Sequence, residues 1–311
     1  MTLLEVKGLK KAFGSRQAVN GVSFSVEEGE VFGLLGPNGA GKSTTLSLVC
    51  GLLKANAGKI TVGGFDIVKE ATKAKKLIGI VPQEPAIYPM LSAKANLRFW
   101  GTINGIPADK LEKAVNDVLK VVGLEDRATG KVSNYSGGMK RRLNIAAGLI
   151  HKPKLLIMDE PTVGIDPQSR NHILETVKNL RLKDITVIYT SHYVEEVEYL
   201  CDRVAIMDNG QIITEGTLPE LLQQGDEFQE LTINLNSFSQ DIQDSIQTLP
   251  GVEKAFSLKE KLNIITSNAE QVLPLAFETI VGHGGMVSEI KIHKPNLESL
   301  FLKLTGKALR D

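Results

Sequence analysis

A nine-residue segment rich in glycine has the composition of a site that holds phosphate groups. It consists of Gly36, Pro37, Asn38, Gly39, Ala40, Gly41, Lys42, Ser43 and Thr44. The segment follows an apolar strand and opens a helix, which is the context in which the pattern G-x-x-x-x-G-K-[ST] forms a phosphate-binding loop. Backbone N–H groups and the helix N-terminus then favour an anion. We expect Lys42 to reach the β- and γ-phosphates of a nucleotide and Ser43 to ligate Mg²⁺.

Two adjacent carboxylates follow a second apolar strand. Residues 155–159 read Leu-Leu-Ile-Met-Asp, and Glu160 comes next. An apolar run of this kind indicates a buried parallel strand, and parallel sheets bind their ligands at the carboxyl ends of their strands. We therefore expect both carboxylates beside the phosphate-binding loop. Asp159 is suited to hold Mg²⁺, and Glu160 is suited to polarise an attacking water.

A third segment is able to present backbone amides to an anion. Ser136 is the expected N-cap of a helix, and Gly137 and Gly138 leave the first amides of that helix uncovered. A Ser-Gly-Gly string by itself also suits an ordinary loop. Its position between the phosphate-binding loop and the acidic strand, at the start of a helix, favours the functional interpretation.

These segments need an α/β framework to bring them together. Apolar strands alternate with amphipathic helices up to about residue 224, which indicates an α/β core with a mostly parallel sheet. A helix is expected from Ser43 to Leu53, and a hairpin turn at Asn209-Gly210. The strands are expected at Val22–Val26, Val31–Leu35, Ile78–Val81, Leu155–Asp159, Ile185–Thr190 and Arg203–Asp208. The first two are joined by the turn at residues 27–30.

Two further regions depart from this alternation. Residues 89–152 show helical periodicity only, which predicts a helical insert with helices at Ser92–Asn104, Asp109–Val122 and Gly137–Ile150. Residues 225–311 carry the order βαββαβ, with a turn at residues 259–261, and this order predicts a small α+β domain of the ferredoxin-like kind. A last amphipathic helix carries Leu297, Leu300, Phe301 and Leu304 on one face.

The order of the motifs resembles that of the ATP-binding-cassette (ABC) ATPases. Residues 135–142, Tyr-Ser-Gly-Gly-Met-Lys-Arg-Arg, resemble the signature usually written Leu-Ser-Gly-Gly-Gln, with Tyr135 and Met139 as departures. The resemblance covers residues 1–224. It implies a P-loop NTPase cassette with antiparallel N-terminal strands. It also implies that Ser136, Gly137 and Gly138 act on the ATP bound by a second copy of the chain.

The resemblance assigns roles to residues that carry no signal of their own. Gln83 resembles the glutamine that senses Mg²⁺ and contacts the transporter, and His192 resembles the switch histidine that contacts the γ-phosphate. The resemblance therefore counts Gln83 and His192 with Glu160 as catalytic residues, and Gln83 with Ser43 and Asp159 as a ligand of Mg²⁺. Residues 161–166 are similar to the loop at which partner subunits touch. Phe13 occupies the place of an aromatic residue that stacks on adenine, and Val19 that of a residue making an apolar contact.

Bulk composition limits the partners. Lys plus Arg and Asp plus Glu both number 36, so no net charge favours nucleic acid. No run of about 18 apolar residues is present, so direct membrane insertion is not expected. The two cysteines, Cys50 and Cys201, lack metal-ligand spacing and suit a reduced compartment. The resemblance to ABC cassettes further implies a cytoplasmic protein at the inner face of the cell membrane, attached through a separate permease.

The expected activity is ATP hydrolysis that drives transport, with ATP and Mg²⁺ bound and two copies pairing on ATP. Residues 295–306 resemble the closing segment of bacterial exporter cassettes of the antibiotic-resistance and sodium-efflux kind. One alternative is a non-transport ABC ATPase acting on nucleic acid or the ribosome, but the sequence lacks the coiled-coil insertion, second cassette or basic tail typical of that class. Another is a kinase, which leaves the Ser-Gly-Gly segment and His192 without a purpose.

Overall fold

The computed structural model describes residues 1–311 with the exception of 182–183, 224–228, 237–238, 259–260, 294–295 and 306–311. The described chain forms two compact units, one spanning Met1–Gly216 and one beginning at Thr217. The domain boundary predicted at residues 224–225 falls outside the described residues, as do residues 259–260 of the predicted turn and both ends of the segment 295–306. No described helix is long and apolar enough to cross a membrane.

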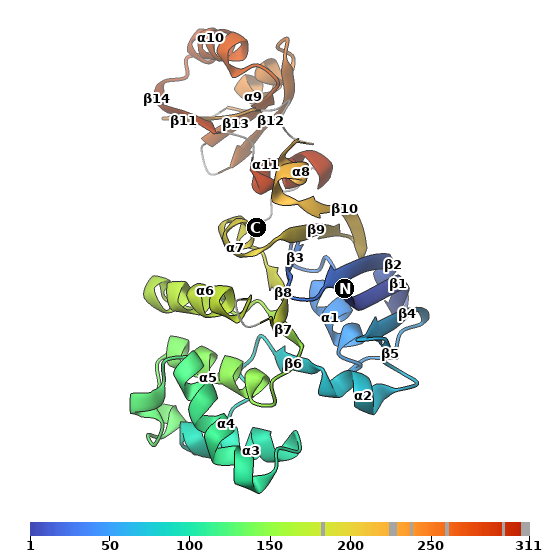
Figure 1. Ribbon diagram of the computed structural model, residues 1–311. Coiled ribbons are helices and arrows are strands. Elements are labelled where there is room, and N and C mark those ends of the chain that lie inside the picture. The colour runs from blue at the N-terminus through green and yellow to red at the C-terminus, as the bar shows by residue number, and fades with distance from the viewer. Residues whose placement is uncertain (182–183, 224–228, 237–238, 259–260, 294–295, 306–311) are drawn as a thin grey trace. The chain divides into compact units, whose positions relative to one another are not determined.

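Two sheets form the framework of the first unit (Figure 1). A four-stranded sheet has the order β2-β1-β4-β5, and its neighbouring strands are antiparallel. Its strands are β1 (Thr2–Phe13), β2 (Arg16–Glu27), β4 (Ala57–Val62) and β5 (Phe65–Asp66). The turn at residues 27–30 therefore joins strands of different sheets, because β2 lies in this sheet and β3 in the next.

The second sheet has six strands in the order β10-β9-β3-β8-β7-β6. Strands β6, β7, β8, β3 and β9 lie next to each other in that order, and each neighbouring pair is parallel. The apolar sequences of these strands predicted a parallel sheet. The strands are β3 (Val31–Leu35), β6 (Ile78–Val81), β7 (Leu155–Asp159), β8 (Thr186–Ser191), β9 (Arg203–Asp208) and β10 (Gln211–Thr217). The turn between β9 and β10 is at Asn209 and Gly210, which have φ of 48° and 76°.

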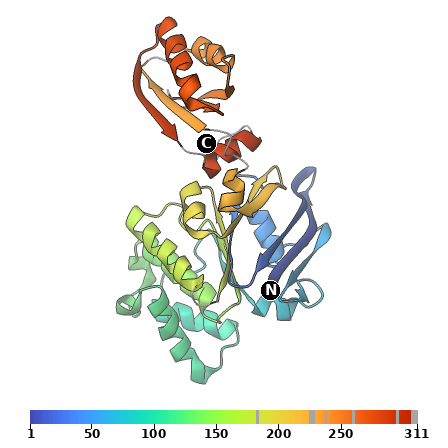
Figure 2. The ribbon, with the colours of Figure 1, turned by 45° about the horizontal axis from the view of Figure 1, so that its top comes forward.

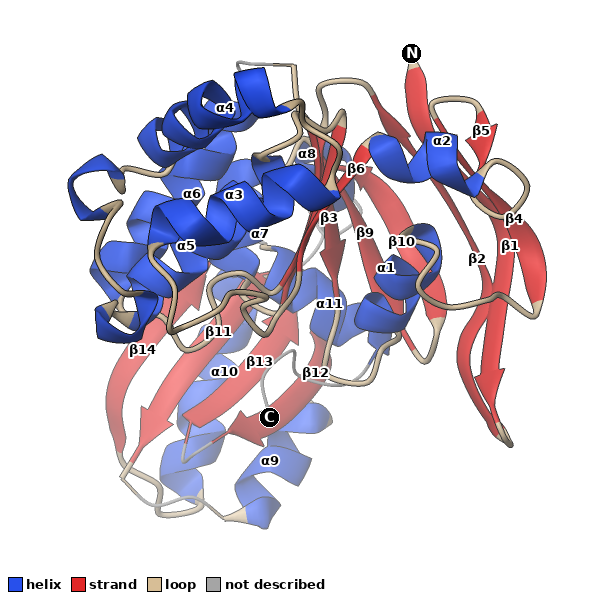
Figure 3. Ribbon diagram, turned by 90° about the horizontal axis from the view of Figure 1, so that it is seen from below, coloured by secondary structure: helices blue, strands red, loops and turns tan. Residues whose placement is uncertain are grey.

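Helices cover one face of this six-stranded sheet, and α1 and the antiparallel sheet lie on the other side (Figure 3). The α-helices of the first unit, on both sides of the sheet, are α1 (Lys42–Val49), α2 (Ala71–Lys76), α3 (Ala93–Ile103), α4 (Ala108–Val121), α5 (Gly137–Leu149), α6 (Pro167–Arg181) and α7 (Val194–Leu200). Short 3₁₀ turns occupy Glu125–Arg127 and Val132–Asn134. Helix α1 ends before the predicted Leu53, because the chain turns at Gly51 with a φ of 63°.

Successive residues of the central strands belong to different hydrophobic clusters. On β7, Leu156 and Met158 pack in the cluster that includes the helical insert, whereas Leu155 and Ile157 pack in the cluster that includes α1 and the antiparallel sheet. Side chains alternate across a strand, so a strand buried on both faces must be apolar throughout. This double burial fixes the carboxyl end of β7, where Asp159 and Glu160 follow.

The second unit contains an antiparallel sheet of order β12-β13-β11-β14 with helices α9 and α10 packed along it (Figure 2). Its elements are α8 (Leu218–Gln223), β11 (Gln229–Leu235), α9 (Gln240–Gln247), β12 (Val252–Leu258), β13 (Lys261–Thr266), α10 (Ala269–Gly282), β14 (Val287–His293) and α11 (Leu297–Thr305). Leu231 and Ile233 of β11 pack with Ile242, Val272 and other residues of the two helices. The alternation of apolar residues along β11 accounts for this one-sided burial.

Candidate active site

The glycine-rich loop lies between the carboxyl end of β3 and the start of α1. Gly41 precedes the helix with a φ of 104°, a left-handed conformation that an L side chain rarely adopts. A Cβ atom at this position would also lie 2.5 Å from the carbonyl oxygen of Ala18. Glycine is therefore required here, and its conformation turns the chain into the helix with the first amides facing the loop.

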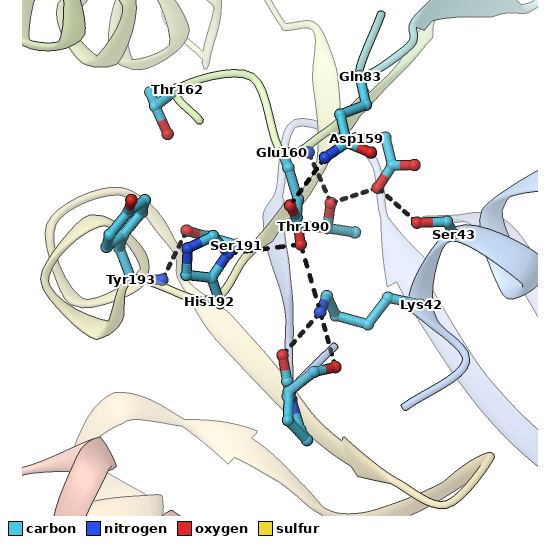
Figure 4. Close-up of polar contacts among 12 residues, drawn as sticks. Lys42, Ser43, Gln83, Asp159, Glu160, Thr162, Thr190, Ser191, His192 and Tyr193 are labelled. Carbon is cyan, nitrogen blue, oxygen red and sulfur yellow. Dashed lines mark hydrogen bonds and ion pairs between the residues drawn. The ribbon is translucent and has the colours of Figure 1, made fainter. Parts of the chain in front are cut away.

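Lys42 is buried at the base of this loop. Its ammonium group donates to the carbonyl oxygens of Gly36 at 2.7 Å and Pro37 at 3.2 Å, and it lies 3.4 Å from Oε1 of Glu160 (Figure 4). Burial lowers the pKa of Lys42, and the carboxylate of Glu160 opposes that shift. A buried cation beside the phosphate-binding loop is suited to neutralise phosphate oxygens.

Asp159 and Ser43 place two oxygen atoms next to each other. The Ser43 hydroxyl donates to Oδ1 of Asp159 at 3.2 Å, and the Thr190 hydroxyl donates to the same atom at 2.8 Å. Asp159 is the residue opposite Thr190 in the pairing of β7 with β8, so the sheet register holds the carboxylate. A hydroxyl and a carboxylate are oxygen ligands of the kind that Mg²⁺ takes.

Glu160 lies between three of the predicted site residues. Its backbone N–H donates to the Thr190 hydroxyl at 2.9 Å, and Gln83 Nε2 donates to its Oε2 at 3.3 Å. Nδ1 of His192 lies 3.5 Å from its Oε1, on the same oxygen that faces Lys42. Glu160 has a φ of 45°, and a non-glycine residue in this region stores strain that is typical of active sites.

A cleft of about 420 Å³ opens beside these residues. Its lining consists of Phe13, Arg16, Ala18, Pro37, Asn38, Gly39, Ala40, Gly41, Lys42, Ser43, Thr44, Gln83 and Glu160. Phe13 is half exposed, as a side chain that stacks on a base requires. Val19, by contrast, is fully buried in the core and is not among the residues that line the cleft, whereas its neighbour Ala18 is.

Arg16 lines the cleft and was not predicted from the sequence. Its guanidinium lies against the phosphate-binding loop, since a Cβ atom at Gly39 would be 3.5 Å from NH2 of Arg16. Among the residues that the structure describes, none forms a hydrogen bond or ion pair with this group. An arginine two residues after Gly14 carries no pattern that distinguishes it from a solvent-exposed turn residue.

We expect Arg16→Ala to weaken ATP binding about tenfold, because one charge-assisted contact to a phosphate or ribose oxygen is lost. Arg16→Lys keeps the charge and should retain part of the affinity. Calorimetric titration of the folded variants with ATP measures both dissociation constants. An unchanged constant for Arg16→Ala would place the side chain outside the nucleotide site.

The Ser-Gly-Gly segment begins α5, as predicted. The Ser136 hydroxyl accepts a hydrogen bond from the N–H of Met139 at 3.2 Å and so caps the helix. A Cβ atom at Gly138 would lie 2.0 Å from the Ser169 hydroxyl of α6, so glycine is required by the close packing of the two helices. Ser136, Gly137 and Gly138 are not among the residues that line the cleft.

Helix α5 also holds the segment that carries Gln83. Arg141 and Asn144 both donate to the carbonyl oxygen of Pro82, at 2.9 Å and 3.2 Å. Asn144 Oδ1 also accepts from the N–H of Ala86 at 3.0 Å. The Gln83 segment is therefore pinned on both sides to the helix that begins with Ser136.

Comparison with known proteins agrees with this geometry. A family model described as "ABC transporter" matches residues 19–163. The chain is 50% identical over 313 residues to the linearmycin resistance ATP-binding protein LnrL of Bacillus subtilis (strain 168), covering 99% of this chain and all of that protein. It is 36% identical over 312 residues to the Nod factor export ATP-binding protein I of Ralstonia nicotianae, covering 99% and 95%.

Solved structures match about 70% of the chain. The structure of cbiO1 from Clostridium perfringens, part of the ABC transporter complex cbiONQ, has a TM-score of 0.66 and 32% identity, and the match covers 72% of this chain and 92% of that one. A dimeric post-hydrolysis state of the cassette MJ0796 with ADP and Pi has a TM-score of 0.63 and 26% identity, covering 70% and 99%. Since half of all residues are identical to those of a relative along both whole chains, this chain belongs to the ATP-binding subunits of ABC transporters, which hydrolyse ATP for transport.

Proposed function

We propose that the chain is the ATPase subunit of an exporter and drives a separate membrane permease by pairing with a second copy of itself when ATP binds. The convergence of Lys42, Gln83 and His192 on Glu160 carries the proposal. This arrangement joins a phosphate-binding cation to a carboxylate able to activate water. Export is supported by similarity to proteins named for antibiotic resistance and for export. Because the proposed permease lies in the cell membrane, the chain would be held at the inner face of that membrane.

Mg²⁺ fits the donor set of this site. Ser43, Gln83 and Asp159 would hold the ion, directly or through water, and Gln83, which also contacts Glu160, would sense its presence. When bound, Mg²⁺ neutralises charge on the phosphate oxygens. The chain itself supplies the remaining functions: Lys42 binds phosphate, Glu160 accepts the proton of the attacking water, and His192 contacts the γ-phosphate.

Two copies are needed because the Ser-Gly-Gly segment lies outside the cleft it is expected to serve. Ser136, Gly137 and Gly138 form the N-terminus of α5, where Ser136 and Gly137 are exposed, and a helix N-terminus favours an anion. We assign them to the ATP held by the partner. The match to a solved dimeric cassette supports this arrangement.

The second unit is proposed to be a ferredoxin-like accessory domain from about residue 225. The element order βαββαβ and the fully antiparallel sheet support this assignment. It contributes none of the residues that line the cleft. An assembly or regulatory role is therefore more suitable for it than a role in nucleotide binding.

The permease is proposed to dock on an apolar surface beside the Gln83 segment. We define the docking patch as the exposed side chains Tyr88 and Phe99 together with those near them in the sequence, Met90, Leu91 and Ile103. The rings of Tyr88 and Phe99 pack edge to face with centroids 4.9 Å apart. Buried Asn96 of α3 donates to the carbonyl oxygen of Tyr88 and accepts from its N–H, which fixes the patch to the insert. A cluster of exposed apolar residues is typical of a protein interface.

Met90→Asp tests the docking patch and the exporter proposal together. The variant should lose co-purification with the permease, because a charge is desolvated at the interface. Its ATPase activity without the permease should stay unchanged. Val68→Asp is the matched control, since Val68 is 70% exposed and Met90 71% exposed, and it should keep the complex. Equal binding by both variants, or failure of the unaltered chain to bind the permease, would contradict the proposal.

A further inference from the structure

A buried carboxylate on α7 has one partner near Glu160 in the sequence and another next to His192. Glu196 is 1% exposed, and an ionised carboxylate at that depth requires several partners. Its Oε2 accepts hydrogen bonds from the hydroxyls of Thr162 at 2.8 Å, Tyr189 at 2.8 Å and Ser191 at 2.9 Å. Its Oε1 forms an ion pair with Nε of Arg170 at 2.6 Å.

Two of these donors, Thr162 and Ser191, lie close in sequence to the proposed catalytic residues. Thr162 comes two residues after Glu160, and Ser191 comes immediately before His192. The Ser191 hydroxyl also accepts from the N–H of Tyr193 at 2.9 Å, so it holds the chain on both sides of the histidine (Figure 4). One carboxylate oxygen thus joins the segment after Glu160 to the segment that carries His192.

Other contacts strengthen the same connection. Arg170 of α6 pairs with Glu196 and places its guanidinium 4.7 Å from the centre of the Tyr193 ring. The backbone at Glu160 has a positive φ, and such a conformation persists only where surrounding contacts impose it. The hydrogen bond from Thr162 to Glu196 is one of these contacts.

We propose that Glu196 is a positioning residue for ATP hydrolysis. Its carboxylate keeps the segment after Glu160 and the segment of His192 in register, and so sets the 3.5 Å separation between Nδ1 of His192 and Oε1 of Glu160. Glu196 does not line the cleft, so it acts through these two residues. The inference rests on the proposed role of Glu160 as the group that activates water.

The cluster supplies its own matched control. Thr162, Ser191 and Tyr189 donate hydrogen bonds of similar length to one oxygen, but only Thr162, two residues after Glu160, and Ser191, the neighbour of His192 at the end of β8, adjoin the reacting groups. Tyr189 lies inside β8 opposite Met158 of β7, three residues before His192. Removing the Tyr189 hydroxyl therefore takes one hydrogen bond from the Glu196 carboxylate but leaves those of Thr162 and Ser191 in place.

The test compares Thr162→Val, Ser191→Ala and Tyr189→Phe in the full chain. Thr162→Val and Ser191→Ala should lower kcat about tenfold, the effect of one hydrogen bond to a charged group, while the dissociation constant of ATP changes less than about twofold. Tyr189→Phe should lower the unfolding temperature about as much as Thr162→Val and Ser191→Ala do, because each variant removes one hydrogen bond from the same carboxylate. It should nevertheless keep kcat within about twofold of the unaltered chain. Thr162→Ser restores the donor and should restore kcat. Glu196→Gln should lower kcat at least as much as Thr162→Val.

The outcomes separate this role from a purely structural one. The proposal is overturned if Thr162→Val and Ser191→Ala keep the kcat of the unaltered chain, or if Tyr189→Phe loses as much kcat as they do. Glu160→Gln is measured alongside. Normal turnover in Glu160→Gln would instead overturn the catalytic assignment on which the inference rests.

Discussion

Glu160→Gln lowers ATP turnover about 10²–10⁴-fold and leaves ATP binding in place, the largest effect expected of a single substitution in this chain. The amide has the shape of the carboxylate but accepts no proton from the attacking water. The phosphate-binding loop is unchanged, and Lys42 keeps its hydrogen bonds to the carbonyl oxygens of Gly36 and Pro37. Phosphate release measures the turnover, and titration with ATP measures binding.

Glu125→Gln is the control for the change of charge, because Glu125 is exposed on a 3₁₀ turn of the helical insert. It should hydrolyse ATP at the rate of the unaltered chain. Glu160→Gln with near-normal turnover would remove Glu160 from the mechanism, and Asp159 would then be the remaining carboxylate at the site.

The second large effect is the restoration of activity by mixing two inactive variants. Lys42→Ala lacks the phosphate grip but keeps an intact Ser136 segment. Ser136→Glu has the reverse defect, because a carboxylate beside the γ-phosphate repels it. Each variant alone forms only defective sites. In a mixed pair, one site combines both damaged halves and the other combines both intact halves, so random pairing of independent sites restores roughly a quarter of normal turnover.

ATP-dependent pairing of the mixture is measured in parallel, since coupling between the two sites lowers turnover even where the geometry is correct. A mixture that regains neither turnover nor pairing would contradict the shared site. Full activity of Ser136→Glu alone would show that the Ser-Gly-Gly segment does not face nucleotide at all.

Much of the framework was predictable because strands buried on both faces of a sheet have continuous apolar sequences. The strands Ile78–Val81, Leu155–Asp159 and Arg203–Asp208 have the predicted bounds, since only apolar residues fit between two packed layers. The phosphate-binding loop and the acidic strand end were equally readable, because their chemistry depends on residue types at fixed spacing. In the structure, Nζ of Lys42 and Nδ1 of His192 lie 3.4 Å and 3.5 Å from Oε1 of Glu160.

The unpredicted features depend on the direction of single side chains and on contacts between distant segments. Val19 and Ala18 are neighbours on β2, and neighbouring side chains of a strand point to opposite faces, so Val19 is buried in the core while Ala18 lines the cleft. Arg16 reaches the loop only because β2 passes beside it. Glu196 and Thr162 are 34 residues apart, and no local pattern marks their hydrogen bond.

The most direct test of the central claim, that ATP binding draws two copies of this chain together, is the mass of Glu160→Gln in solution. Light scattering is recorded with Mg²⁺ present, first without nucleotide and then with saturating ATP. Because hydrolysis is blocked, ATP should hold the closed pair and raise the mass to that of two chains. Adding the Ser136→Glu substitution should abolish the increase. A mass that stays that of one chain while ATP occupies the site would contradict the account.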